Sequence, residues 1–211
     1  MLCHFTRIEW LQGIIERGGV LSTRTLLADP STAHHRNDPH RVDGHLDHVS
    51  CSIDYPNAWT IRSYRNRYAG YCRGWIVICI KPTAIWADDT LFCPVNASRG
   101  SGRYVSGGIG GFAAMYNTRV PSFKVGPRLG SHLRSCPTDM QAEVLIRDSI
   151  PTESVLGVVV EGEQLRTEVD QILAGADTEI RCLVSPGFFD PYRLATDIKH
   201  NQEQLLSFAC G

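Results

Sequence analysis

One acidic residue inside an apolar segment constrains this chain more than any other feature of its sequence. Residues 141–146 read Gln-Ala-Glu-Val-Leu-Ile, and a second apolar run follows over residues 155–160. Because side chains alternate along a strand, Gln141, Glu143 and Leu145 would share one face. A carboxylate among aliphatic side chains must be paired or serve a task, since burying it unpaired is costly. The alternative is an edge strand whose Gln141 and Glu143 simply face water.

The composition is that of an ordinary globular protein. With 211 residues, 43% of them hydrophobic and 20% charged, the chain is expected to form one domain over residues 1–211. No basic-then-apolar signal segment opens the sequence, and no apolar run approaches the roughly 18 residues of a membrane span. The eight cysteines are scattered without a Cys-x-x-Cys pair, which favours free thiols in a reducing compartment. The sequence therefore predicts a cytoplasmic protein without membrane contact.

Strand and helix signals are mixed along the chain. Apolar runs predict strands over residues 1–6, 49–53, 74–81, 90–97, 141–146, 155–161 and 179–184. Helical spacing and capping residues predict helices over 7–17, 57–71, 111–116 and 165–175, and one that Asp190-Pro191 opens. Neither a regular βαβ alternation nor a Gly-x-Gly-x-x-Gly motif between a strand and a helix is present, so an α+β fold is favoured over a doubly wound one.

A long basic stretch lies in the middle of the chain. Between Thr90 and Thr138 there is no Asp or Glu. The cations there are Arg99, Arg103, Arg119, Lys124, Arg128 and Arg134, with Tyr104, Phe112, Tyr116 and Phe123 among them. Cations can follow phosphates and rings can stack on bases, so this stretch has the composition of a site for single-stranded nucleic acid. A solvated loop with a chance run of charge is the alternative.

Residues 28–48 form a polar segment rich in ionisable groups. It contains His34, His35, Arg36, His40, Arg41, His45 and His48, with Asp29, Asp38, Asp43 and Asp47. His and Asp together suit zinc or iron, but no helical His-x-x-x-His or His-Glu-x-x-His spacing is present. We favour a cover over a charged ligand, with Arg36 or Arg41 gripping phosphates, over a metal site or a solvated loop.

Four short motifs follow one another over most of the first 165 residues. They are His4-Phe5-Thr6 before an apolar helix, Arg36-Asn37, Asp47-His48-Val49 with the strand into Pro56, and Gln141-Ala142-Glu143 with Ile150-Pro151 downstream. Their order resembles that of the DarT family, toxins that ADP-ribosylate DNA. Each motif is short, so the order carries the resemblance.

The resemblance implies both a fold and an activity. The fold is an ADP-ribosyltransferase-like α+β domain, with two packed mixed or antiparallel sheets, flanking helices and an NAD cleft between the sheets. The activity is transfer of ADP-ribose from NAD to a nucleobase of single-stranded DNA, with release of nicotinamide and no metal. The chain would be a toxin of a toxin–antitoxin or phage-defence system, with a macrodomain antitoxin as its partner. RNA or protein acceptors, a non-catalytic nucleic-acid-binding module and a metal-dependent hydrolase are the alternatives.

The resemblance also assigns roles to single residues. Glu143 would stabilise the positively charged ribose and take a proton from the attacking base. Arg36 or Arg41 would be the catalytic arginine, with Arg36 also close to NAD. The remaining assignments are His4, Thr6 and Ser52 to NAD, Gln141 to the acceptor base, and Arg99, Arg103, Tyr104 and Arg134 to the DNA strand.

Overall fold

The computed structural model describes residues 1–211 except 33–40, 123, 177, 205 and 207–211. Its central element is an eight-stranded sheet in the order β10-β9-β4-β1-β3-β7-β5-β6. Every neighbouring pair is antiparallel except β9 with β10. The strands are β1 (Leu2–Arg7), β3 (His48–Ile53), β4 (Trp75–Ile80), β5 (Leu91–Cys93), β6 (Ser106–Gly107), β7 (Glu143–Arg147), β9 (Val155–Val160) and β10 (Cys182–Val184).

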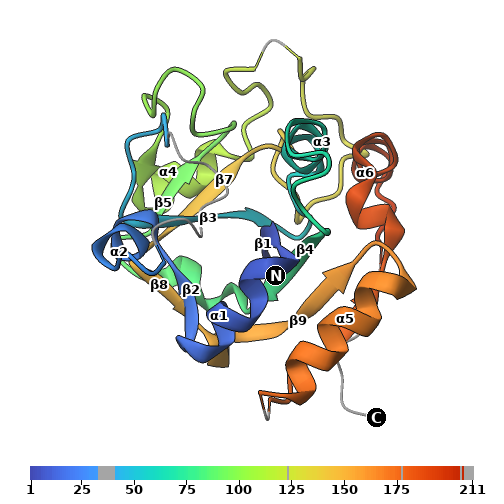
Figure 1. Ribbon diagram of the computed structural model, residues 1–211. Helices are drawn as coiled ribbons and strands as arrows, with labels where there is room; N and C mark the ends of the chain where they lie inside the picture. Colours follow the sequence, from blue (N-terminus) through green and yellow to red (C-terminus); the bar gives the residue numbers. More distant parts are fainter. Residues whose placement is uncertain (33–40, 123, 177, 205, 207–211) are drawn as a thin grey trace.

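A second, two-stranded sheet pairs β2 (Gly19–Leu21) with β8 (Ser149–Pro151). The helices are α1 (Leu11–Glu16), α2 (Thr23–Ala28), α3 (Ala58–Arg67), α4 (Gly108–Ala114), α5 (Glu163–Ala174) and α6 (Pro191–Lys199). In Figure 1, the blue segments α1, β2 and α2 lie together beside β3, and α3 and α6 lie side by side. The predicted α+β class is confirmed, with one large and one small sheet.

Strand β4 lies at the centre because both of its faces are apolar. All six of its side chains are buried. Side chains alternate across a strand, so they divide between the two sides of the sheet. Ile76, Ile78 and Ile80 join one hydrophobic cluster, and Trp75, Val77 and Cys79 join the other. Helix α5 packs into the first cluster through Val169 and Leu173, whereas α3 and α6 pack into the second through Ile61 and Leu194.

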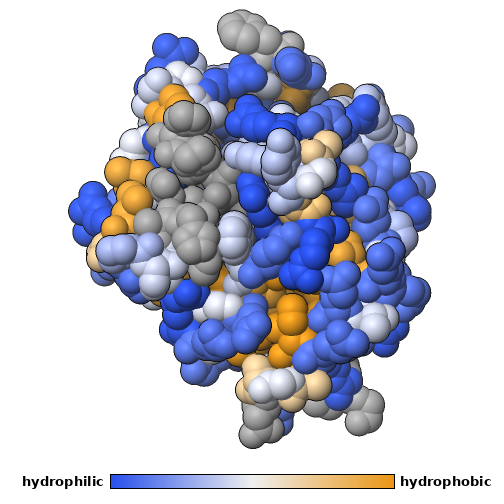
Figure 2. Space-filling view, in the orientation of Figure 1, coloured by the Kyte–Doolittle hydropathy of each residue, from blue (hydrophilic) through white to orange (hydrophobic). Residues whose placement is uncertain are grey.

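The surface differs from this interior. The face shown in Figure 2 is mainly hydrophilic, with a smaller hydrophobic area in the lower middle of the view. None of the helices in the described part of the chain has both the length and the apolarity needed to cross a membrane.

Several element boundaries differ from the sequence predictions. The strand expected over 141–146 begins only at Glu143, because Gln141 and Ala142 lie in a turn. The prediction that Gln141 shares a strand face with Glu143 is therefore wrong. The strand expected over 90–97 is only three residues long, since Pro94 has no N–H to donate to a sheet. Strands β2 and β8 were not predicted, because three residues are too few to show a period.

Both predicted helix caps are confirmed. The side chain of Asn57 accepts from the backbone N–H of Thr60 at the start of α3. The carboxylate of Asp190 accepts from the backbone N–H groups of Tyr192 and Arg193, at 2.9 and 3.1 Å, and Pro191 opens α6. These caps satisfy N–H groups that have no partner within the helix.

Replacing Asp190 by Ala removes the carboxylate oxygen that accepts both hydrogen bonds in the first turn of α6. We expect Asp190→Ala to lower the free energy of unfolding by about 1 kcal/mol. The Asp190→Asn variant keeps a side-chain oxygen and is expected to retain most of the stability. Urea unfolding of the three proteins measures the difference. Equal losses in the two variants would contradict a capping role.

Candidate active site

A cavity of about 550 Å³ lies between the large and the small sheet. Its walls come from β1 and β3 of the large sheet, from β2 of the small sheet, and from helices α1, α2 and α3. Its lining includes Trp10 and Arg17 as well as Asn96, Gln141 and Glu143. The expectation of a cleft between two sheets therefore agrees with the structure.

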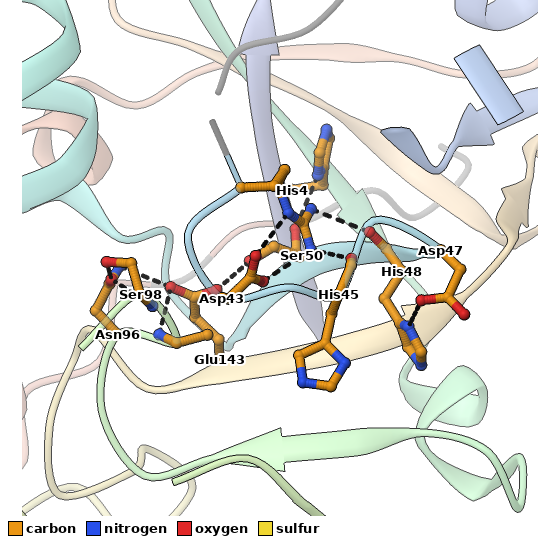
Figure 3. Close-up of polar contacts among 11 residues, drawn as sticks. His4, Asp43, His45, Asp47, His48, Ser50, Asn96, Ser98 and Glu143 are labelled. Atoms are coloured by element: carbon orange, nitrogen blue, oxygen red, sulfur yellow. Dashed lines mark hydrogen bonds and ion pairs between the residues drawn. The ribbon is translucent and has the colours of Figure 1, made fainter. Parts of the chain in front are cut away.

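Glu143 is the first residue of β7 and lines this cavity. Its strand lies between β3 and β5, and the residue is only 9% exposed. One carboxylate oxygen, Oε2, accepts from Ser50 Oγ at 2.5 Å. The other, Oε1, accepts from Asn96 Nδ2 at 2.7 Å and from the backbone N–H of Ala97 at 3.2 Å. Figure 3 shows Ser50 and Asn96 pointing toward it. The alternative of a solvated edge strand is thus wrong.

The surroundings of Glu143 bring its titration close to neutral pH. Burial raises the pKa of Glu143 to about 7, because a charged carboxylate loses its hydration there. The hydrogen bonds from Ser50 and Ala97 favour the ionised form and oppose this rise in pKa. The Asp43 carboxylate raises the pKa further, and the Arg41 guanidinium lowers it. A group with this pKa can both stabilise positive charge and exchange a proton near pH 7.

Arg41 also lines the cavity, but its guanidinium binds the protein's own chain. It forms a two-pronged pair with Asp43, with Nε to Oδ1 at 3.0 Å and Nη2 to Oδ2 at 2.9 Å. It also donates to the carbonyl oxygens of His45 and His48. With a side chain only 10% exposed, Arg41 holds the segment that leads into β3. Arg36, the other candidate arginine, lies outside the described residues.

Three of the residues assigned to NAD, namely His4, Thr6 and Ser52, line the cavity. His4 Nδ1 lies 2.9 Å from the carbonyl oxygen of Ser50, which can only accept, so Nδ1 carries the proton. Burial lowers the pKa of His4, and the ring is neutral at pH 7 with a lone pair on Nε2. Thr6 and Ser52 are both buried, and Ser52 Oγ donates to the carbonyl of Cys3 at 3.4 Å.

Gln141 reaches the cavity from the turn before β7. Asp139 builds this turn, since its Oδ1 accepts from the backbone N–H of Gln141 and its carbonyl accepts from that of Ala142. Asp139 is only 2% exposed, and burial raises its pKa. The acceptor assignment of Gln141 thus depends on this turn and not on a shared strand face.

Comparison with known proteins identifies the family. The family model described as "ssDNA thymidine ADP-ribosyltransferase, DarT" matches residues 3–190. The chain belongs to the DarT family. No curated protein matches it. Among solved structures, the chain is similar to the DarT of Thermus sp. 2.9.

Two of the Thermus structures, described as complexes with ADP-ribosylated ssDNA and with NAD+, each show 16% identity and a TM-score of 0.62. The match covers 90% of this chain in both, and 95% and 96% of the Thermus chains. Thermosipho africanus DarTG, in complex with ADP-ribose, is similar with 11% identity and a TM-score of 0.57 over 89% of this chain and 50% of that chain. These matches confirm the ADP-ribosyltransferase-like fold of a DarT protein.

Two side chains that bind the carboxylate of Glu143 were not predicted from the sequence. Ser50 lies 93 positions before Glu143, and Asn96 lies 47 positions before it. The alternation of His48, Ser50 and Ser52 along β3 could have placed Ser50 on the Ser52 face. No local signal marks Asn96, because its contact depends on how the loop after β5 folds.

The DNA-binding assignments of this DarT chain fall outside the cavity. Arg99, Arg103, Tyr104 and Arg134 are not among the described residues that line it. Arg103 stacks on the ring of Tyr104 at 4.6 Å and also donates to its hydroxyl. Arg99 Nη1 lies 3.5 Å from the carbonyl of Pro121, and Arg134 is exposed. The loop that carries Arg99 and Arg103 begins at Asn96 and Ser98, which do line the cavity.

Within the described part of the chain, one group of side chains could hold a metal ion. Ligand atoms of His45, Asp47 and His48 lie within 4.8 Å of one another. Asp47 already lies 2.9 Å from His48 Nδ1 and within 4.0 Å of the guanidinium groups of Arg24 and Arg147. Two guanidinium groups at the only carboxylate of the group oppose cation binding.

The raised pKa of Glu143 predicts how stability depends on pH. The pKa of a glutamate in an unfolded chain is about 4.3. The folded state therefore binds more protons between that value and about 7, and the free energy of unfolding falls as pH rises through this window. In Glu143→Gln, the side-chain oxygen still accepts from Asn96 and Ala97, and its amide donates to Ser50.

Glu143→Gln removes this titration. We expect the variant to have a higher free energy of unfolding than the unmodified protein at pH 8.5. The difference between the two proteins should be larger at pH 8.5 than at pH 5 by up to about 3 kcal/mol. Urea unfolding at the two pH values measures the change. A stability difference that is equal at pH 5 and pH 8.5 would contradict a buried carboxylate with a raised pKa.

Proposed function

We propose that this chain transfers ADP-ribose from NAD+ to thymine in single-stranded DNA. The observation that carries the proposal is a buried carboxylate, held by three donors, in a cavity whose walls come from the segment that the DarT family model matches. The Thermus DarT structures described as complexes with NAD+ and with ADP-ribosylated ssDNA support both substrates. The sheet that carries Glu143 includes strands from β1 to β10, which supports a single domain.

The chemistry requires a group that stabilises positive charge at the ribose. When the bond between C1′ and nicotinamide breaks, the electron pair leaves with nicotinamide and the ribose becomes oxocarbenium-like. The ionised Glu143 carboxylate stabilises this charge. The N3 nitrogen of thymine then bonds to C1′, and its proton passes to Glu143, which restores neutral thymine. General-base help of this kind contributes about 10²–10⁴ in rate.

The other cavity residues bind and orient the two substrates. Neutral His4 accepts a hydrogen bond from NAD+ through Nε2, and the hydroxyls of Thr6 and Ser52 contact the same ligand. Gln141, fixed by its turn, hydrogen-bonds the acceptor base. Arg41 contributes positive charge near Glu143 and His4 while it holds Asp43. Arg36 stays a prediction for the second arginine.

The basic loop and its neighbours serve the DNA strand. Arg99, Arg103 and Arg134 neutralise phosphates, and Tyr104 offers a ring for stacking. A base in single-stranded DNA reaches the cavity without the cost of leaving a duplex.

The family assignment also bears on the setting of the activity. A DarT toxin acts on DNA in the cytoplasm and is neutralised by a macrodomain antitoxin that removes ADP-ribose. The similarity to a DarTG protein, whose chain is about twice as long as the matched part, supports such a partner.

Incubation with NAD+ and separate acceptors tests the proposed function. We expect mass spectrometry to find one ADP-ribose on thymine-containing single-stranded DNA, and none on a matched strand without thymine. Glu143→Gln should lower the rate at least about 100-fold while NAD+ binding changes only a few-fold. Transfer to RNA or protein instead would keep the chemistry and replace the acceptor. An active Glu143→Gln variant would remove the central role of the carboxylate.

A metal-free reaction separates this function from that of a metal-dependent hydrolase. We expect excess EDTA to leave transfer to DNA unchanged, since none of the steps above uses a cation. His45→Ala, which breaks the one described His-Asp-His group, is the matched control and should also be active. Loss of transfer with EDTA, restored by a single added metal, would favour the metal-dependent alternative.

A further inference from the structure

The hydrogen bonds of Asn96 have a fixed direction. Its amide oxygen accepts from the backbone N–H of Ser98 at 3.1 Å and also from the Ser98 hydroxyl. A backbone N–H can only donate, so the oxygen faces Ser98 and the NH₂ group faces Glu143. The two ends of the amide therefore cannot be exchanged without losing bonds on both sides. Figure 3 shows Asn96 and Ser98 together beside Glu143.

The two oxygens of Glu143 consequently differ in what they can do. Oε1 faces Asn96 Nδ2 and the Ala97 N–H, which are donors that cannot become acceptors. Oε2 faces Ser50 Oγ, a hydroxyl that can rotate and either donate or accept. A proton on Oε1 would meet two N–H groups, whereas a proton on Oε2 can be donated to Ser50. Oε2 is thus the oxygen that can be protonated and deprotonated.

The ionisable groups around Glu143 divide into charged and neutral ones. Asp43 and Arg41 face it from the segment before β3, and their opposite effects on its pKa partly cancel. The thiol of Cys51 on β3 and that of Cys93 on β5 also lie near it. Burial raises the pKa of Cys51 far above neutral and that of Cys93 to about 11, so both are uncharged at pH 7. Because these groups add little net charge beside Glu143, a fixed donor such as the Asn96 amide matters for keeping its carboxylate ionised.

We propose that Asn96 is a positioning residue of the transferase, which holds Oε1 of Glu143 as an acceptor and leaves Oε2 to handle the proton and the ribose charge. The proposal rests on the proposed function, because it assigns to Asn96 an action through Glu143. It also assigns to Asn96 a part in setting the pH at which the enzyme becomes active. Asn96 itself forms no bond with the reacting atoms.

The pH dependence of the reaction distinguishes this role from a merely structural one. In the unmodified enzyme, kcat/KM should rise with pH through about 7 as Glu143 ionises. In Asn96→Ala, the loss of a hydrogen bond to a charged group should move this rise about one to two pH units higher. Activity at pH 7 should fall about 5- to 50-fold, activity at pH 9 should recover to within a few-fold, and KM for NAD+ should change little.

Two further variants complete the experiment. Asn96→Asp places a second carboxylate beside Glu143 and should move the rise in kcat/KM at least as far as Asn96→Ala does, because neighbouring carboxylates resist joint ionisation. Asn201→Asp makes the same change of charge on an exposed turn after α6 and should leave the profile unchanged. Circular dichroism checks folding, and Asn96→Ala decides the question if Asn96→Asp does not fold.

The outcomes separate this inference from the function on which it rests. Asn96→Ala activity that falls equally at every pH, or does not fall, would overturn the positioning role, even with Glu143→Gln inactive. An active Glu143→Gln variant would overturn the proposed function itself, and the inference with it. A profile shifted in the two Asn96 variants and not in Asn201→Asp supports the proposal.

Discussion

The burial of one carboxylate determines how the parts of this molecule must be arranged. Glu143 can leave water only if its oxygens find donors, since an uncompensated buried charge is costly. Those donors come from different places in the chain: Ser50 from β3, and Asn96 and Ala97 from the loop after β5. Strand β7 lies between β3 and β5, so the order of the strands in the sheet places the donors on both sides of the carboxylate. The order of the strands in the sheet therefore determines which donors surround Glu143.

The segment from Arg41 to His48 also brings charged groups close to Glu143. Arg41 adopts a positive φ of 39°, and its pair with Asp43 and its bonds to two carbonyls hold the backbone in this conformation. Gly102, with φ of 81°, packs against the Asp43 carbonyl so closely that a side chain would not fit. The basic loop that begins at Asn96 is thus fixed to the Arg41 segment, and both segments lie next to Glu143. Arg41 lowers the pKa of Glu143 and Asp43 raises it, so burial is the main influence on this pKa.

The sequence predicted the parts that depend on local patterns and missed those that depend on distant contacts. Strand β4 and the caps at Asn57 and Asp190 were predicted, because apolar runs and capping residues act within a few positions. The need of Glu143 for hydrogen-bond partners was also predictable, since an unpaired carboxylate among aliphatic residues is costly. Its partners were not, because Ser50 and Asn96 lie far from it in the chain.

Gln141 and Arg41 were placed less well for a related reason. A strand pattern over 141–146 looks continuous, but the side chain of Asp139 accepts from the Gln141 N–H, and the strand begins only at Glu143. The sequence suggests that Arg41 is available to bind phosphates, but Asp43, two positions later, binds its guanidinium group. In both cases a nearby carboxylate competes for a group that the sequence pattern assigns elsewhere. Short-range side-chain competition is thus a second limit on prediction, beside distant contacts.

The proposed function explains why this carboxylate is placed where it costs stability. Burial that raises the pKa of Glu143 to about 7 also makes its ionised form unfavourable in the folded state above that pH. The same loss of hydration would strengthen the proposed attraction between that carboxylate and a positive ribose, because little water remains to screen it. The three donors reduce the cost without removing it, and they do so unequally at the two oxygens. An apolar side chain at this position would not titrate, but it would leave the three donors without their acceptor and the cavity without a group that could stabilise the cation.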